Sequence, residues 1–535
     1  MNKKLFTSLL TFWFIPTLFY SQGITILPGA YVTVKSSAYV KTTEAAGFTI
    51  QSTASGTGSV IDENGGITVA GTTTVQRYIA TDFKWHFLSS PVSGQPIWPE
   101  FAPTPTGSNF LDFTWGSTPT WGWDYYSWNP NASATTQLYW VNLRNTDGSY
   151  NYRDIDGNGN EGGYGQATPP ALSVGRGYLA AYNEGWKSGS PTIHSFTGTL
   201  NSGTIDKSII QGVNSFNLVG NPFPSAIDWK GPGWGRTDLV PSGGGYDYWI
   251  FNDDLAVGNY GVCNSADDVG TNGTTRYIAP MQGFFIKVAN ATGILSMTSA
   301  VQVHATQTWL KESNTENNML RLKLTTEANS YSDEMILEVN PAFVNGGSEK
   351  FWSMYQEAPE IYSIKDGLSY SIDRMPEVVE NSVVNLGIKA GLSSVYALTV
   401  TGLSNFSVAT SVTLEDLKTG TSQKLNDNNV YTFNAGPGDP ANRLKLHFGG
   451  LYGTEDILNP NPVSIYASGN NIIIYSNPAT ILKGDVRIYD LVGRTIRHLT
   501  ANDSFIRINM GGNKGYYIVN VLTDSKIFNG KVFLK

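Results

Sequence analysis

Hydrophobic and polar residues alternate in short runs along the first part of the chain. Val32 and Val34 alternate with more polar neighbours, and this period of two is typical of a strand with one buried face. Steps of small residues separate this run from similar ones, a pattern that fits the stacked rungs of a solenoid. We therefore predict a short β-solenoid-like region over residues 22–78, with a simple hairpin domain as the alternative.

A degenerate repeat follows, in which a buried strand stops at a corner of small, polar and proline residues. A second landmark lies downstream in each copy and aligns Gly177 with Gly283. The pattern predicts tandem β-domains over residues 79–212 and 213–306, with the extra length of the first copy between its two landmarks. The matching segments are WHFLSSPV (85–92) with FNLVGNPF (216–223), and LSVGRGYLAAY (172–182) with IAPMQGFFIKV (278–288).

The third part of the chain is a further series of alternating strands. A polar linker at residues 311–318 precedes it, and its strands are spaced as in a β-sandwich, which we predict over residues 319–451. Composition supports this interpretation, because 57 glycines and 12% aromatic residues favour short strands and turns over long helices. We therefore predict an all-β, multidomain protein, since 535 residues exceed what one core holds.

The charge distribution and the cysteine count bear on two questions: whether the protein binds nucleic acid and whether a disulfide stabilises it. The net charge of −8 is spread without a Lys/Arg block, so we expect no binding to nucleic acid. Cys263 is the single cysteine, which excludes an intramolecular disulfide. We expect Cys263 to be a small buried core residue, with a reactive thiol as the alternative.

The beginning of the chain has the pattern of an export signal. Lys3 and Lys4 precede an apolar run over residues 5–20 that is shorter than a membrane span and contains Pro16. We predict a signal peptide over residues 1–21, cleaved after Ser21. No other stretch is apolar enough to span, so we expect no transmembrane segment in the mature chain.

The region 459–535 reads as a small β-sandwich of short alternating strands and tight turns. Its motifs, in order, resemble the type A sorting domain of type IX secretion cargo: NPV (461–463), YSNPA (475–479), VRIYDLVGRTI (486–496), GYYIVNV (515–521) and GKVFLK (530–535). The motif positions that we single out are Tyr489, Asp490, Gly493, Gly515, Tyr517 and Lys531.

This resemblance implies that the C-terminal domain directs secretion of the rest of the chain, the passenger, and that the domain itself catalyses no reaction. It implies that the outer-membrane type IX secretion machinery recognises the domain and usually removes it. The passenger is then expected to be secreted, or attached to the outer cell surface through a surface glycolipid.

One acidic segment resembles half of a calcium loop. Asp154, Asp156 and Asn158 alternate before Gly159, as in the first part of an EF-hand loop, and we add Asn160 as a fourth ligand. The twelfth position is a glycine instead of the bidentate glutamate that the loop needs. Weak calcium binding and a solvated acidic turn therefore both remain open, and we predict no other cofactor.

Aromatic residues offer a second candidate site. Eleven of the fourteen tryptophans lie between Trp85 and Trp249, and Trp121, Trp123 and Trp128 are candidates for stacking on sugar rings. The alternative is that aromatic residues fill the cores of β-domains that lack disulfides, and we favour burial for most of them.

The sequence offers no recognisable catalytic centre. Its five histidines lack paired spacing for zinc, neither G-x-S-x-G nor H-E-x-x-H occurs, and no two carboxylates can be placed at glycosidase spacing. We favour a non-enzymatic adhesion or glycan-binding passenger. The alternatives are a polysaccharide-active hydrolase with an unrecognised site and a structural surface component that self-associates.

Overall fold

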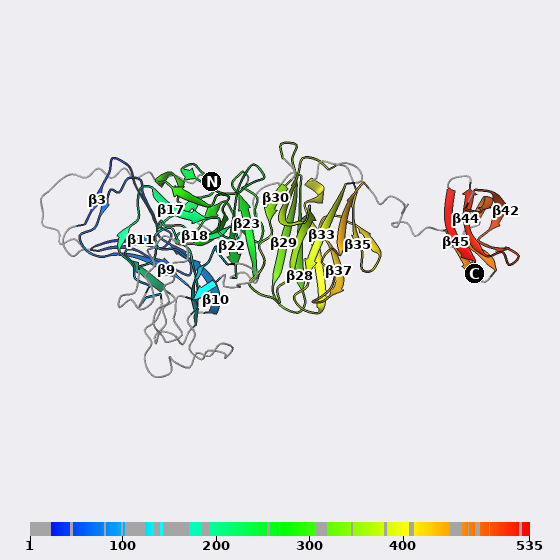
Figure 1. Ribbon diagram of the computed structural model, residues 1–535, viewed down its shortest axis with the longest axis horizontal. Coiled ribbons are helices and arrows are strands. Elements are labelled where there is room, and N and C mark those ends of the chain that lie inside the picture. Colours follow the sequence, from blue (N-terminus) through cyan, green and yellow to red (C-terminus); the bar gives the residue numbers. More distant parts are fainter. Residues whose placement is uncertain are drawn as a thin grey trace, which may run out of the picture. The chain divides into compact units, whose positions relative to one another are not determined.

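A computed structural model gives the fold (Figure 1). It describes residues 23–42, 47–79, 82–97, 100–101, 124–132, 140–142, 171–183, 193–253, 257–266, 268–305, 318–343, 346–378, 382–405, 411–449, 463–468, 470–476, 482–491, 493–523 and 527–534. The chain forms two compact units, residues 1–378, 384–409 and 425–445 in the first and residues 379–383, 410–424 and 446–535 in the second. The described elements are almost entirely β-strands, which confirms the all-β, multidomain prediction.

The first part of unit 1 is a parallel β-solenoid. Strands β1, β4 and β9 pair in parallel, and Ile26, Ile50 and Val75 stack in register at exposures of 7%, 0% and 0%. Parallel pairs β2–β7 and β3–β8 complete the rungs, so the solenoid-like prediction is confirmed. The strands are β1 (Ile24–Ile26), β2 (Tyr31–Val34), β3 (Val40–Lys41), β4 (Phe48–Ile50), β5 (Ser52–Thr53), β6 (Gly56–Thr57), β7 (Ser59–Asp62), β8 (Ile67–Thr68) and β9 (Thr73–Tyr78).

The repeat is visible in the strand register. Leu88 pairs with Tyr178 in the first copy, and the aligned residues Val219 and Phe284 pair in the second. The sheet order β10-β14-β12-β13 accordingly matches β18-β25-β22-β23. The first copy contains β10 (Asp82–Leu88), β11 (Val92–Ser93), β12 (Asp124–Trp128), β13 (Trp140–Asn142), β14 (Tyr178–Asn183), β15 (Ile193–Thr197) and β16 (Thr199–Leu200).

The second copy is slightly more elaborate and includes a 3-10 turn. Its elements are β17 (Ile205–Ile210), β18 (Phe216–Gly220), β19 (Ala226–Asp228), β20 (Trp234–Gly235), β21 (Pro241–Ser242), β22 (Gly245–Asn252), β23 (Asn259–Asn264), β24 (Tyr277–Ile278), β25 (Gly283–Lys287), β26 (Thr292–Met297), η2 (Ser299–Val301) and β27 (Gln302–Val303). An outer antiparallel pair accompanies the sheet of each copy. In the first copy β15 pairs with β9 of the solenoid, and in the second β17 pairs with β26.

The two copies contact each other reciprocally. Leu88 bridges to Gln282, and their counterparts Val219 and Arg176 form the equivalent bridge. A Cβ on Gly177 would lie 2.5 Å from the Val219 carbonyl oxygen, so a glycine is needed for this close approach. The copies therefore pack as an isologous pair around an approximate two-fold axis.

Two of the predicted domain boundaries, after residue 78 and after residue 306, fall inside unit 1. Strand β9 belongs to the solenoid and pairs with β15 of the first copy, so residue 78 lies within a continuous sheet. Asn259 in the second copy donates from Nδ2 to the carbonyl oxygens of Ser332 (2.9 Å) and Pro359 (2.9 Å) in the third part. These hydrogen bonds are buried, which explains why the parts form one compact unit.

The third part is built around a large sheet in which β33-β31-β32-β29-β28-β34-β37 are neighbours. Leu320, Leu322 and Leu324 alternate along β28 and are completely buried, as a period of two requires. The elements in unit 1 are β28 (Met319–Thr326), β29 (Ser332–Val339), β30 (Gly346–Glu349), β31 (Glu360–Lys365), β32 (Leu368–Met375), β33 (Val383–Lys389), β34 (Ser394–Thr401), η3 (Leu403–Asn405) and β37 (Asn429–Ala435). Strands β35 (Val412–Asp416) and β36 (Thr421–Lys424) and most of β38 (Leu444–Phe448) belong to unit 2.

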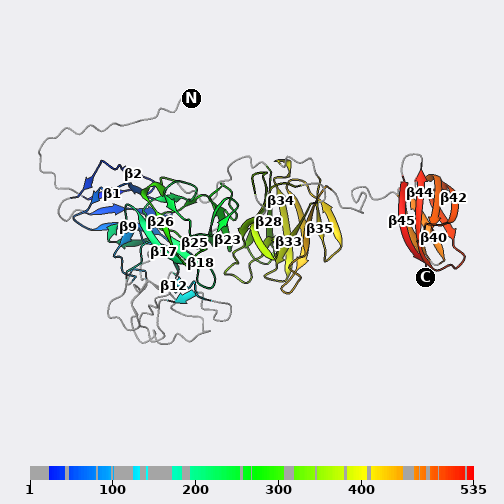
Figure 2. The same ribbon diagram turned by 45° about the horizontal axis from the view of Figure 1, so that its top comes forward.

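The C-terminal part of unit 2 is a small β-sandwich, as predicted (Figure 2). A three-stranded sheet, β39-β40-β43, and a four-stranded sheet, β42-β41-β44-β45, enclose a core that includes Ile474, Val486 and Val519. The strands are β39 (Val463–Ser468), β40 (Asn471–Ser476), β41 (Leu482–Tyr489), β42 (Thr495–Asp503), β43 (Phe505–Asn509), β44 (Gly515–Thr523) and β45 (Ile527–Leu534).

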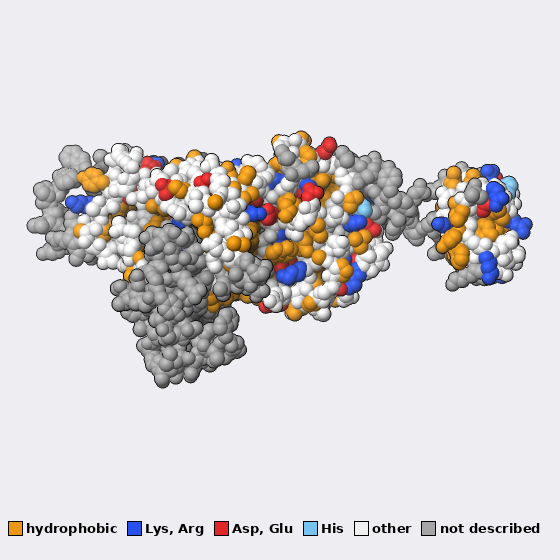
Figure 3. All heavy atoms as spheres, viewed as in Figure 1, with side chains coloured by type: hydrophobic (Ala, Val, Ile, Leu, Met, Phe, Trp, Pro, Cys, Tyr) orange, Lys and Arg blue, Asp and Glu red, His pale blue; other side chains and the backbone are white. Residues whose placement is uncertain are grey.

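The surface of the described residues mixes charges of both signs. Figure 3 shows Lys and Arg side chains interspersed with Asp and Glu on the visible face. Within the described part of the chain, no helix has the length and apolar character that a membrane span would require.

Candidate functional site

Several predicted site residues lie outside the described residues. These are the calcium-loop candidates Asp154, Asp156, Asn158 and Asn160, and the stacking candidates Trp121 and Trp123. Among the described residues, no group of three or more His, Cys, Asp or Glu side chains could hold a metal ion.

Trp128 is a core residue instead of an exposed stacking platform. Its side chain is only 9% exposed, and its Nε1 donates to the Phe216 carbonyl oxygen at 2.8 Å. Its ring centroid lies 4.8 Å from that of Phe285 and 5.0 Å from that of Trp140. The prediction that Trp128 stacks on a sugar is therefore wrong, because the ring is enclosed in the aromatic core between the two repeat copies.

Cys263 is completely buried and carries no disulfide, and it packs in the core of the second copy. This is the environment of a small hydrophobic residue, as expected. The reactive-thiol alternative would need an accessible sulfur, which this position does not provide.

The residues of the predicted sorting motif lie on β41, β44, β45 and their turns. Asp490 accepts from the Arg494 backbone N–H at 2.9 Å and from the Arg494 side chain at 2.7 Å. Gly493 lies in this turn with a φ of 83°, which favours glycine. These contacts explain locally why the D-x-x-G-R segment makes a tight turn after β41.

The other motif positions line the four-stranded sheet. Tyr489 ends β41, Gly515 begins β44 and Tyr517 is buried, with its hydroxyl donating to the Asn513 carbonyl oxygen at 3.4 Å. The Lys531 ammonium lies 4.8 Å from the Tyr516 ring centroid on the exposed side of the sheet.

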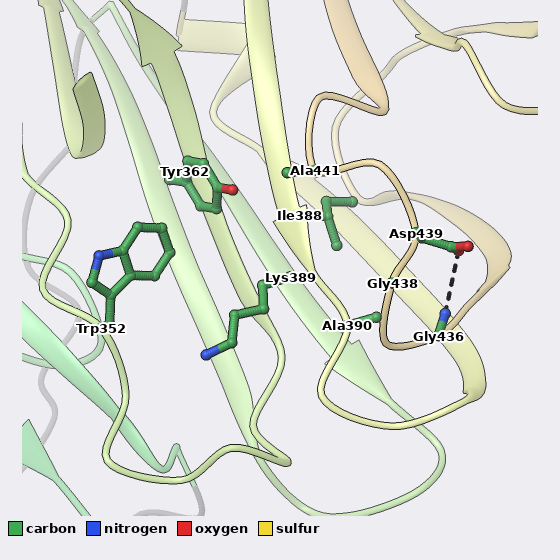
Figure 4. A pocket seen from close by; sticks show the side chains of 9 residues that line it. All are labelled: Trp352, Tyr362, Ile388, Lys389, Ala390, Gly436, Gly438, Asp439 and Ala441. Carbon is green, nitrogen blue, oxygen red and sulfur yellow. Dashed lines mark hydrogen bonds between the residues drawn. The ribbon is translucent and has the colours of Figure 1, made fainter. Parts of the chain in front are cut away.

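The sequence did not predict the hollow that we take as the candidate ligand site. It has a volume of about 350 Å³ and lies in the third part of unit 1 (Figure 4). We call it the Trp352 hollow and define it by its lining residues, which are Trp352, Tyr362, Ile388, Lys389, Ala390, Gly436, Gly438, Asp439 and Ala441.

One side of the Trp352 hollow is aromatic. Trp352 is 45% exposed, and its ring meets Tyr362 edge-on with centroids 5.0 Å apart. Tyr362 on β31 pairs with Gly387 on β33, and a Cβ at position 387 would collide with the Tyr362 ring. The glycine thus lets the tyrosine ring lie across the neighbouring strand and support the tryptophan.

Lys389 forms the floor between the two sides. It stands opposite Glu360 in the β31–β33 register, and its Nζ lies 2.5 Å from Glu360 Oε1. Glu360 is completely buried, whereas Lys389 is 43% exposed at the side chain. Burial raises the pKa of Tyr362 above its ordinary value, and the Glu360 charge adds to this, so the Tyr362 hydroxyl is a hydrogen-bond donor at neutral pH.

The opposite side of the hollow is the turn at residues 436–441. Gly436 donates its backbone N–H to Asp439 Oδ2 at 3.3 Å, as Figure 4 shows, and Gly438 has a φ of 94°. Asp439 Oδ2 also lies 3.8 Å from Arg443, which is almost completely buried. Because Lys389 and Asp439 each have a counter-charge, the hollow carries little net charge.

These features suit binding better than hydrolysis. Asp439 is the one carboxylate among the described lining residues, whereas glycoside hydrolysis needs two. Glu360 beneath the floor has Oε1 paired with Lys389 and Oε2 accepting from the Ser353 backbone N–H at 3.2 Å. An exposed tryptophan beside neutral and paired polar groups is an arrangement that can hold an uncharged sugar ring.

A comparison with known protein families matches this part of the chain to a family without an assigned function. A family model described as a domain of unknown function (DUF8693) matches residues 244–448. No curated protein matches the chain. The matched segment runs from the start of β22 in the second repeat copy to the end of β38, and it contains the whole Trp352 hollow.

Proposed function

We propose that this protein is exported through the type IX route and that its passenger binds neutral carbohydrate at the Trp352 hollow. The observation that carries the binding proposal is a half-exposed tryptophan, braced edge-on by Tyr362, at the mouth of a hollow with paired polar side chains. Its binding role is that of a non-enzymatic adhesin at the cell surface.

The geometry supports a ring-shaped, uncharged ligand. A sugar ring presents C–H groups to an aromatic face and hydroxyls at its edge, and Trp352 supplies the face. The Lys389 ammonium and the Asp439 carboxylate supply a donor and an acceptor from opposite sides. An acidic ligand would have to compete with Glu360 for Lys389, so we expect neutral glycans to bind better.

The proposal of export through the type IX route depends on residues outside the Trp352 hollow. The C-terminal sandwich carries the resemblance to a sorting domain, and its four-stranded sheet exposes large apolar side chains, with Tyr516 49%, Ile518 38% and Phe533 46% exposed. Exposed apolar groups on one sheet favour recognition by another protein, which supports docking to the outer-membrane machinery.

Affinity gel electrophoresis tests the binding proposal. The exported protein should be retarded in gels that contain a neutral polysaccharide, for which we would use soluble xylan, mannan and β-glucan. Trp352→Ala should abolish the retardation, because stacking residues commonly contribute more than about 1 kcal/mol at binding sites.

Tyr39→Ala is the matched control, since Tyr39 is 80% exposed and lies in the solenoid, away from the hollow. This variant should migrate as the wild type does. Equal retardation of wild type and Trp352→Ala, or release of reducing sugar by the wild type, would contradict the proposal.

A further inference from the structure

Three charged side chains meet in the interior of the third part, beneath the Trp352 hollow. Asp333 on β29, Lys350 directly after β30 and Glu360 at the start of β31 each have side chains that are 0% exposed. Lys350 Nζ lies 2.5 Å from Asp333 Oδ2 and 3.7 Å from Glu360 Oε2. A lysine completely enclosed with two carboxylates is costly as a set of charges, so its chemistry needs an explanation.

We propose that Lys350 and Asp333 form an intramolecular isopeptide bond, with Glu360 as the proton-transfer residue. The amide would join β29 to the end of β30 covalently, in a chain whose single cysteine allows no internal disulfide. This inference concerns a covalent modification and is independent of the proposed carbohydrate site.

The first step is a proton transfer that burial favours. In an apolar interior the neutral pair of amine and carboxylic acid competes well with the ion pair, and the short contact between Nζ and Oδ2 gives the proton a direct path. Burial, together with the nearby Glu360 charge, raises the pKa of Asp333, although Lys350 opposes this. The products of the transfer are a nucleophilic amine and an activated carboxyl group.

The second step forms the bond. The Lys350 amine attacks Asp333 Cγ, while Asp333 Oδ1 accepts from Asn272 Nδ2 at 2.8 Å and is stabilised as negative charge develops. Glu360 Oε2 takes a proton from the attacking nitrogen and delivers it to the departing oxygen. A C–N bond forms, a C–O bond breaks, and one water leaves with two protons from the original ammonium, so no oxidant or reductant is needed.

The surroundings of the carboxyl group fit these roles. Oδ2, the departing oxygen, also accepts from the Ile361 backbone N–H at 2.7 Å, which holds the carboxyl plane in place. Glu360 Oε1 is occupied by Lys389, which leaves Oε2 directed at Lys350. The reacting groups therefore come from three adjacent segments whose backbone is fixed by the sheet.

The chain offers an internal comparison. Lys287 and Glu349 are also 2.5 Å apart, but their side chains are 23% and 31% exposed. Water stabilises this pair as ions, so we expect Lys287 to keep a free amine.

Peptide mass spectrometry of the wild-type protein tests the proposal directly. Trypsin cuts after Lys350 only if its amine is free. In that case residues 324–350, which include both Asp333 and Lys350, are released as one tryptic peptide. With the isopeptide bond, residues 324–365 should appear as one uncut peptide that is about 18 Da lighter than its sequence mass, owing to the lost water. Cleavage after Lys287 should be normal.

A second digestion confirms the position of the link. A chymotryptic cut after Phe343 lies inside the loop between residues 333 and 350, so its two products should stay joined. Glu360→Gln should restore the ordinary 324–350 peptide at its full mass, and Lys350→Arg should give the corresponding peptide ending in Arg, with no loss of water. Recovery of the 324–350 peptide at full mass as the main product from the wild type would overturn the proposal, whatever the variants do.

Discussion

At the residue scale, exposure decides which aromatic side chain can bind a ligand. Trp128 and Trp352 are the same residue type, but Trp128 is 9% exposed within the aromatic core and Trp352 is 45% exposed beside a hollow. A sequence shows where tryptophans are abundant, and abundance correlates with core formation as readily as with binding. The candidate site has one tryptophan, which follows the tryptophan-rich segment in the sequence.

Buried carboxylates at the residue scale predict how stability depends on pH. Asp247 is 5% exposed, and its Oδ1 accepts from Ser348 Oγ and Asn264 Nδ2, each at 2.7 Å. Burial raises its pKa, although Arg374 opposes this. A raised pKa in the folded state means that the folded protein retains a proton that the unfolded chain has lost, so stability falls as pH rises through this window.

We therefore expect Asp247→Asn to remove this loss. The variant should gain stability relative to the wild type in denaturant unfolding as the pH rises above about 4, the ordinary pKa of an aspartate. Asp238→Asn is the control with the opposite sign, because hydrogen bonds from Ile294 N–H and Asn290 lower the pKa of Asp238. Parallel pH curves for wild type and Asp247→Asn would contradict this assignment.

At the scale of elements, the two repeat copies depend on a close approach of their backbones. Gly177 and Gly283 occupy equivalent positions beside this contact, and neither needs a positive φ, so their requirement is steric. A Cβ on Gly177 would lie 2.5 Å from the Val219 oxygen and 2.6 Å from Leu218 Cγ, whereas one on Gly283 would lie no closer than 3.1 Å to any atom. The two copies therefore pack more closely around Gly177 than around the equivalent Gly283.

This asymmetry predicts unequal effects of the same substitution. Gly177→Ala should lower the free energy of unfolding by about 1–3 kcal/mol, a typical cost of overpacking. Gly283→Ala should cost clearly less, because its neighbours need to move by only a few tenths of an ångström. Denaturant titration of both variants measures the difference, and equal losses would show that the copies do not pack as described.

The strands and the repeat can be predicted from the sequence more easily than the Trp352 hollow. Alternation identified strands such as β28, and the equivalence of residues 85–92 and 216–223 indicated the repeat, because both depend on local pattern. The Trp352 hollow depends on long-range pairing, since Tyr362 and Lys389 come from different strands and Asp439 comes from a distant turn. Trp352 itself lies between β30 and β31 without any periodic signal, so no local pattern could have identified it.

At the scale of the whole molecule, we propose that delivery and ligand binding belong to different parts of the chain. The C-terminal sandwich has its own core and carries the sorting resemblance, whereas the candidate ligand site lies within the other compact unit. Separate cores imply that loss of one part leaves the other folded.

Truncation tests the assignment of delivery. A chain that stops after Leu458 should fold and accumulate in the periplasm of the producing cell, because it retains the predicted signal and lacks the proposed sorting domain. Cell fractionation with immunodetection gives the location. Truncated protein found outside intact cells would contradict the sorting assignment.

Binding of neutral carbohydrate at the Trp352 hollow is tested most directly on an array of neutral and acidic glycans. The array is probed with the exported wild-type protein and with Trp352→Ala side by side. We expect wild-type signals that are concentrated on neutral glycans and lost in the variant. An array on which the wild type binds no neutral glycan, or on which both proteins give the same pattern, would contradict the proposal.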